Sequence, residues 1–139
     1  MPTLRANKGL DAGLLLLRVS VAVVLLLHGL FKLTHGIGWI EDMLRHIGVP
    51  GVLAYAVFLG EIVAPLLLIV GVFARLAGLV MAVDLSVVIF LVQRHRIFTR
   101  GPAGGWGIEL EALILLVSLA LALTGPGRYT LSRTARASR

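Results

Sequence analysis

The sequence predicts an all-α fold: an integral membrane four-helix bundle with short loops and a short amphipathic interfacial helix after the first span. Hydrophobic residues make up 58% of the 139 residues and charged residues 14%, whereas soluble domains carry about 45–50% and about 25%. The mean hydropathy is +0.98. The apolar residues form four long runs and do not alternate as in the strands of a membrane barrel. This composition excludes a soluble globule and a disordered chain.

The four apolar runs come close to the ~20 residues that a transmembrane helix needs. They predict spans at about 13–33, 52–73, 76–92 and 108–123. The first run is not a cleavable signal peptide, because its apolar core is too long and no small-residue cleavage site follows it. The second and third spans lie so close in sequence that they must form an antiparallel hairpin. We therefore expect a single membrane domain, residues 1–139, with a basic tail at 128–139.

Two connecting segments have patterns of their own. Apolar residues recur at helical spacing between Trp39 and Ile47, which predicts a short amphipathic helix with Trp39 at the level of the lipid headgroups. A structural cap over the bundle and a gate are about equally consistent with this helix. The glycine-rich residues 101–107 predict a mobile loop that could move over the outer side of the bundle.

Basic residues predict the orientation of the chain. An even number of spans puts both termini on one side, together with Arg5, Lys8, Arg75, Arg128, Arg133, Arg136 and Arg139. The other side carries Arg45, Arg94, Arg96 and Arg100. The positive-inside rule thus favours cytoplasmic termini in a bacterial inner membrane, although the basic loop at 94–100 argues against it. We attribute the net charge of +6 to contact with the lipid bilayer rather than with nucleic acid.

Ionisable residues inside the spans mark the candidate site, because such a side chain is costly in a membrane unless it has a partner. Their depths, at ~1.5 Å per residue, predict two clusters. The inner cluster is a structural ion pair between Arg18 and Asp84 that locks the bundle. The outer cluster consists of His28, Lys32, Glu61, Glu109 and His95. For Glu61 with His28 or Lys32, a structural pair and a functional site are equally consistent with the sequence.

Two neighbouring residues refine the outer cluster. Glu111 points about 200° away from Glu109 around a helix, so only one of them can face the bundle, and we expect Glu109 inside and Glu111 in solvent. Pro65 follows Glu61 by four residues and is expected to kink the second span and open room beside it.

No cofactor of the chain's own is expected. The sequence has no cysteine, which excludes thiol chemistry and a cysteine-held iron–sulfur cluster. His28 and His95 stand on different segments without a closely spaced second histidine, so we expect no haem or metal site.

At this point the chain resembles a known family. Residues 28–32, His-Gly-Leu-Phe-Lys, resemble the His-Gly-x-x-Lys signature of the DoxX family, and Leu-Gly-Glu at 59–61 is similar to its second-helix motif. Gly-Gly at 104–105 followed by Glu109 resembles the start of the family's fourth helix. Gly-Pro-Gly-Arg-Tyr at 125–129 resembles its closing signature. Together the four pieces cover about residues 12–132.

The resemblance implies a small four-helix membrane protein. Some DoxX-like proteins belong to quinone-linked oxidoreductase systems, including a thiosulfate:quinone oxidoreductase, and others to membrane-associated oxidative-stress complexes. More distant relatives act as assembly factors or cargo receptors. The motif positions carried over to this chain are His28, Lys32, Glu61, Glu109 and Tyr129. Arg18 and Asp84 match no motif position.

Three functions follow as hypotheses, with enzymatic activity left open. The first is a quinone- or lipophile-binding subunit, in which His28 and Lys32 donate hydrogen bonds and Glu61 and Glu109 relay protons. A membrane or peripheral redox partner would then supply the electrons. The alternatives are a non-enzymatic assembly or scaffold factor and, less favoured, a small transporter, which would act as a homo-oligomer because four short helices leave little room for a pathway.

Overall fold

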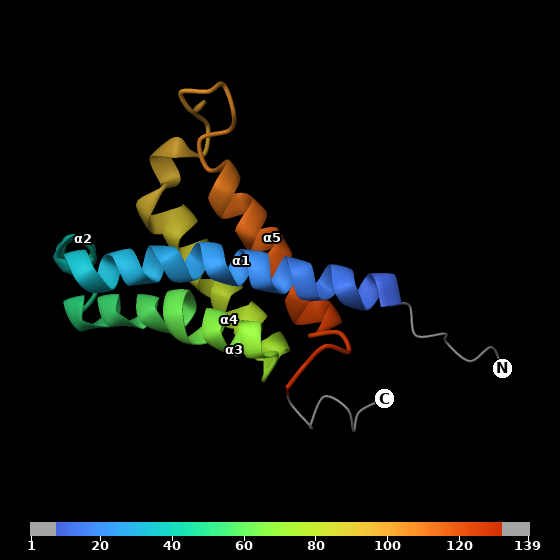
Figure 1. The fold of residues 1–139 in the computed structure, drawn as a ribbon. Helices are drawn as coiled ribbons and strands as arrows, with labels where there is room; N and C mark the ends of the chain where they lie inside the picture. The colour runs from blue at the N-terminus through green and yellow to red at the C-terminus, as the bar shows by residue number, and fades with distance from the viewer. Residues whose placement is uncertain (1–7, 132–139) are drawn as a thin grey trace.

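The computed structural model describes residues 8–131, and across them the chain is helical, with no strand beyond an isolated bridge between Arg100 and Trp106 (Figure 1). The all-α prediction is confirmed. The tail beyond residue 131 lies outside the described residues, as do the basic positions Arg5, Arg133, Arg136 and Arg139. The orientation of the chain in the membrane therefore stays a prediction.

The first span and the helix after it follow the predicted pattern. The first span is α1 (Lys8–His35), which extends beyond its predicted limits at both ends. The amphipathic helix is α2 (Gly38–His46), with Ile40 and Leu44 buried and Asp42 exposed. Its buried face packs on η1 (Gly51–Ala56) in a small apolar core of its own.

The second span changes helix type along its length. It runs without a break from Gly51 to Val70: η1 is a 3-10 helix, η2 (Leu59–Val63) a π-helix and α3 (Ala64–Val70) an α-helix. Pro65 has no N–H to donate to the carbonyl of Glu61, four residues earlier. The disturbance predicted beside Glu61 thus takes the form of a π-helical turn, a geometry that often occurs at functional sites.

The third span follows after a tight turn. The turn comprises residues 71–73, so the predicted antiparallel hairpin is present, with α3 packed against α4 (Ala74–Val87). The remaining helices are η3 (Val88–Val92), η4 (Arg94–Arg96) and α5 (Glu109–Thr124). Helix α5 runs back along α4.

Within residues 8–131, three helical stretches are long and apolar enough to cross a membrane: Lys8–His35, Gly51–Val70 and Ala74–Val92. These correspond to the first three predicted spans. The fourth prediction coincides with α5, which has 16 residues. At ~1.5 Å per residue it is about 24 Å long, shorter than the ~30 Å hydrocarbon core. A fourth complete span is therefore not established.

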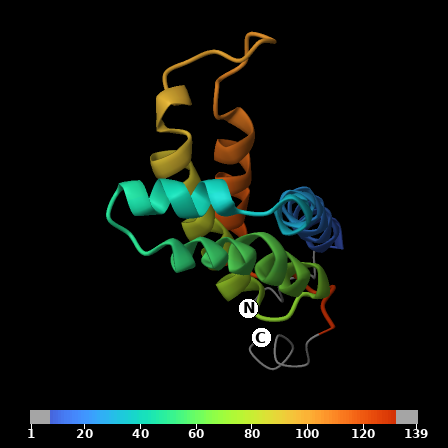
Figure 2. The ribbon, with the colours of Figure 1, turned by 90° about the vertical axis from the view of Figure 1, so that its left-hand side faces the viewer.

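The helices form two arms that meet at one end of the molecule and diverge at the other (Figures 1 and 2). One arm contains α1, α2 and the second span, and the other contains α4, η3 and α5. At the closed end, buried residues of α1, α3, α4 and α5 form the main core, including Ala22, Leu68, Met81 and Leu121. At the open end, α2 and η1 lie in one arm and η3 with the start of α5 in the other (Figure 2). This divergence leaves space between the arms.

Candidate functional site

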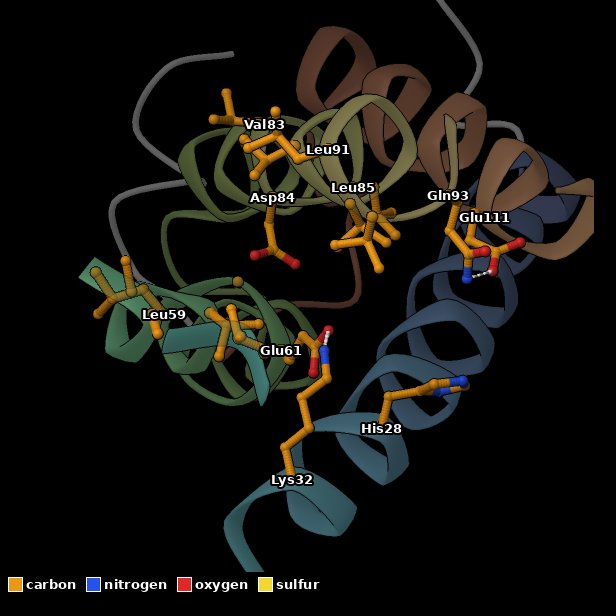
Figure 3. A pocket seen from close by; sticks show the side chains of 18 of the residues that line it. His28, Lys32, Leu59, Glu61, Val83, Asp84, Leu85, Leu91, Gln93 and Glu111 are labelled. Carbon is orange, nitrogen blue, oxygen red and sulfur yellow. Dashed lines mark hydrogen bonds and ion pairs between the residues drawn. The ribbon is translucent and has the colours of Figure 1, made fainter. Parts of the chain in front are cut away.

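A cavity of about 660 Å³ lies between the two arms at the open end (Figure 3). Its walls come from α1, α2, the second span, α4, η3 and α5, and are mostly Leu, Val, Ile and Ala side chains. Leu59, Val83 and Leu91 line it and are also exposed on the protein surface, so the cavity opens between the arms. Its volume falls within the ~300–1,000 Å³ typical of small-molecule sites.

The main polar feature of the cavity is an ion pair between two helices. Lys32 Nζ on α1 donates a hydrogen bond to Glu61 Oε1 on η2. Glu61 is only 3% exposed, and its second oxygen, Oε2, is buried with no hydrogen-bond partner in the part of the chain that the structure describes. Of the two partners considered for Glu61, His28 and Lys32, the structure pairs it with Lys32. Its Oε2 remains buried without a hydrogen bond among residues 8–131.

The ion pair depends on a close approach between α1 and η2 at Gly29. A Cβ at this position would lie 2.7 Å from the carbonyl oxygen of Glu61, too close for any other residue without a backbone shift. This carbonyl is the one for which Pro65 provides no N–H. The glycine between His28 and Lys32 thus brings α1 against the π-helical turn, and Lys32 reaches Glu61 as a result.

Asp84 belongs to this cluster, and its predicted pairing with Arg18 is wrong. Its carboxyl lies directly over Gly60 of η2, where a Cβ would overlap it, and it points from α4 toward Glu61 (Figure 3). Its Oδ2 is buried without a hydrogen-bond partner among residues 8–131. The pairing of Arg18 with Asp84 was predicted from their depth in the membrane alone, without the rotation of each helix about its axis. Gly60 has no side chain, which leaves room for the Asp84 carboxyl to lie against η2.

Arg18 instead binds the chain's closing loop. Its guanidinium donates to the carbonyl oxygens of Pro126, at 2.7 Å, and Tyr129, and the residue is 2% exposed. Asp11, which the sequence did not single out, accepts a hydrogen bond from the Arg128 N–H at 3.0 Å. The sequence feature that could have marked Asp11 is an acidic residue in the first turn of a hydrophobic helix. These contacts fasten the loop at 125–131 to α1 and are structural.

His28 lines the cavity on the α1 side. Its Nδ1 lies 2.8 Å from the carbonyl oxygen of Val24, and because a carbonyl can only accept, Nδ1 carries the proton. This hydrogen bond occupies Nδ1 and leaves Nε2 as the second polar atom of the ring.

The two glutamates of α5 are placed opposite to the prediction. Glu111 lines the cavity and accepts a hydrogen bond from Gln93 Nε2 at 3.2 Å. Gln93 Oε1 in turn accepts from Arg96 at 3.1 Å. Glu109 is exposed, because α5 begins at this residue and its carboxylate folds back over Gly105. The sequence analysis did not single out Gln93. Its position could have marked it, because it is a polar residue at the end of the third span.

The structure does not bring the remaining predicted residues to the cavity. His95 is exposed in η4 and is not among the described residues that line the cavity. The glycine-rich loop at 101–107 projects beyond η4 and α5, away from the arms (Figure 1), and its Trp106 donates to the carbonyl of Ile97 at 2.5 Å. Its mobility stays a prediction. Residues 8–131 hold no group of three metal-binding side chains close enough for a metal ion.

Comparison with known proteins adds two matches. The family model described as DoxX matches residues 13–94, which include Lys32, Glu61 and Asp84. A protein of Bacillus subtilis (strain 168) with the name "Putative oxidoreductase CatD" is 34% identical over 119 residues, covering 86% of this chain and 84% of that protein. No solved structure matches the chain.

Proposed function

This chain belongs to the DoxX family of membrane proteins, and from that premise we propose that it binds a quinone or a similar lipophile as a subunit of a membrane oxidoreductase system. The observation that carries the proposal is the composition of the cavity. Apolar side chains form its walls, and Lys32 and Glu61 line it from one arm while Asp84 lines it from the other. A quinone has the matching chemistry, with an apolar ring and tail and two carbonyl oxygens.

The polar groups suit the head of such a ligand. An ammonium group has three N–H donors, and Lys32 uses one on Glu61 Oε1, so it can also donate to a quinone carbonyl. The tail would lie along Leu59, Val83 and Leu91 and continue between the arms into the lipid. A ligand dissolved in the bilayer would then enter without crossing water.

Proton transfer needs carboxyl groups next to the ring. Reduction of a quinone to a quinol takes up two electrons and two protons, and in this proposal Glu61 and Asp84 would relay the protons to the ring. The hydrogen bonds that join Glu111, Gln93 and Arg96 lead from the cavity toward η4 and offer a route for proton replacement. We assign the electrons to a partner protein with a flavin or metal centre, in line with the oxidoreductase name of the relative.

A binding measurement tests the proposal directly. The chain has two tryptophans, and Trp39 lines the cavity while Trp106 lies in the distant loop. In a Trp106→Phe background, decylubiquinone should quench the fluorescence of Trp39 to a saturable limit. Glu61→Gln should weaken this binding about 10-fold or more, since the amide leaves Lys32 without its ionic partner.

The matched control is Asp42→Asn, the same kind of change at an exposed site on α2 away from the cavity. It should leave the quenching curve unchanged. Quenching that never saturates and has the same slope in all variants would mean that the quinone merely partitions into the detergent, and would overturn the proposal.

A further inference from the structure

The segment that follows the third span carries positive charge without ionic partners. It comprises residues 94–107, which we call the arginine loop, and it contains Arg94, Arg96 and Arg100 but no acidic residue. Among the described residues, none of these arginines has a carboxylate within 4.0 Å. Arg94 and Arg100 are exposed, and Arg96 uses one of the five N–H groups of its guanidinium on Gln93. The loop can therefore bind an anion that belongs to another molecule.

The arginine loop also exposes aromatic side chains. Phe98 is 97% exposed and Trp106 is 49% exposed. An aromatic ring gains stabilisation when an apolar environment replaces the water around it. One carboxylate, that of Glu109, folds over Gly105 of the loop, so positive charge remains in excess. This combination of bases and aromatic rings fits a partner that has both an anionic and an apolar part.

Hydrogen bonds within the loop hold these side chains on a common frame. The Gly107 N–H donates to the Thr99 carbonyl at 2.9 Å, and Trp106 Nε1 donates to the Ile97 carbonyl at 2.5 Å. An isolated backbone bridge joins Arg100 to Trp106. The Trp106 indole is therefore part of the loop's own fold and lies on the same frame as the arginines.

The position of the loop relative to the third span favours a lipid as this partner. The candidate span Ala74–Val92 ends two residues before Arg94. At about 2.0 Å per residue in a 3-10 helix, Arg94 and Arg96 lie within about 8 Å of the end of the span. The headgroup region on one side of a bilayer is about 5–8 Å thick. The arginines are thus at the depth of the lipid phosphates, closer to the membrane than a protein in solution.

We propose that the arginine loop binds the headgroup of an anionic phospholipid, with Arg94 and Arg100 on the phosphate and Phe98 embedded at the boundary between headgroups and acyl chains. A guanidinium can donate two parallel hydrogen bonds to a phosphate. A basic residue near an anionic membrane surface raises the affinity by about 5-fold. No residue of the loop is among the described residues that line the cavity, so this site is independent of the proposed quinone site.

Trp106 makes the proposal testable by fluorescence. In a Trp39→Phe background it is the only tryptophan of the chain. The protein is reconstituted into phosphatidylcholine nanodiscs that contain increasing fractions of brominated phosphatidylglycerol or of brominated phosphatidylcholine with the same acyl chains. Bromine quenches tryptophan at close range. Phosphatidylglycerol should reach half-maximal quenching at a mole fraction at least about 5-fold lower than phosphatidylcholine does.

A double variant assigns this preference to the arginines. Arg94→Gln combined with Arg100→Gln should reduce the ratio of the two half-maximal fractions to about 1–2. Arg45→Gln is the matched control, because Arg45 is also exposed but is already paired with Glu41 and Asp42. The control should retain the wild-type ratio. A ratio that the double variant retains overturns the role of Arg94 and Arg100.

A second variant tests the aromatic part of the site. Phe98→Ala should weaken the quenching of Trp106 by both brominated lipids to the same extent and leave their ratio unchanged, because Phe98 contributes apolar contact and no charge. Quenching by both lipids that is equal to the wild-type level overturns the role of Phe98.

The remaining outcomes test the choice of partner. Equal half-maximal fractions for the two lipids in the wild-type chain overturn the anionic headgroup site. Absence of Trp106 quenching by either lipid overturns contact with the bilayer and points to an acidic protein in solution. Inorganic phosphate added at constant ionic strength should leave the ratio unchanged. A ratio that phosphate abolishes assigns the arginines to the free ion and overturns the lipid site.

Discussion

Each end of the molecule holds a cation of α1, Arg18 at the closed end and Lys32 at the open end, and the two cations have different kinds of partner. At the closed end, Arg18 donates to backbone carbonyls of Pro126 and Tyr129, and its Nε has no hydrogen-bond partner among residues 8–131. At the open end, Lys32 pairs with a carboxylate that keeps a free oxygen, beside a second carboxyl with another. Backbone partners are fixed by the fold, whereas the side-chain cluster at the open end lines a cavity. The contrast indicates that the closed end serves stability and the open end serves binding.

The largest expected effect comes from Arg18→Met. It leaves two carbonyls of the closing loop without their donor and removes a side chain that is 2% exposed. Two hydrogen bonds to a charged group contribute about 3–6 kcal/mol together, so the free energy of unfolding should fall by about that amount in an SDS titration. Arg94→Met, at an exposed position in η4, is the control. A loss below about 1 kcal/mol would remove the structural role of Arg18.

A smaller loss is expected for Gly29→Ala at the contact between the backbones of α1 and η2. The new Cβ would meet the Glu61 carbonyl at 2.7 Å, so α1 must move away from η2. Such overpacking costs about 1–3 kcal/mol and should also weaken quinone binding, because Lys32 moves with α1. Gly13→Ala is the control on the same helix, since no atom lies within 4 Å of its Cβ. Equal stability of the two variants would contradict the close-contact interpretation.

The smallest change in stability is expected for the double variant Lys32→Met, Glu61→Leu. Replacing a buried ion pair by apolar residues of similar size is often neutral or stabilising, so the free energy of unfolding should fall by less than about 1 kcal/mol. Quinone binding should nevertheless be lost. Retained stability together with lost quinone binding would assign the ion pair of the open end to binding alone. A stability loss as large as that of Arg18→Met would show that this pair is structural as well.

The sequence predicted the elements better than their mutual rotation. Apolar runs located α1, the second span and α4, and helical spacing located α2, because these patterns depend only on neighbours along the chain. The partner of Arg18 was missed because it is backbone, which no residue type signals. Asp84 was singled out but assigned the wrong partner, because the direction of its side chain depends on how α4 rotates against Gly60.

The beginning of a helix was another source of error. Glu109 and Glu111 differ by about 200° around a helix, so the choice between them depends on where α5 begins and how it faces the cavity. The structure starts α5 at Glu109, which lets this side chain fold over Gly105 and leaves Glu111 to line the cavity. Lys32 and Glu61 were placed together correctly because both lie near the same level of adjacent spans.

The contacts of Arg18 also determine the order in which the fold can be completed. Its acceptors at Pro126 and Tyr129 lie 108 and 111 residues further along the chain. During synthesis, α1 is made long before these carbonyls leave the ribosome, and until then Arg18 lacks its native partners. These contacts are therefore among the last of the closed end to form, and a chain that stops before residue 126 would leave the Arg18 guanidinium without both of its native acceptors.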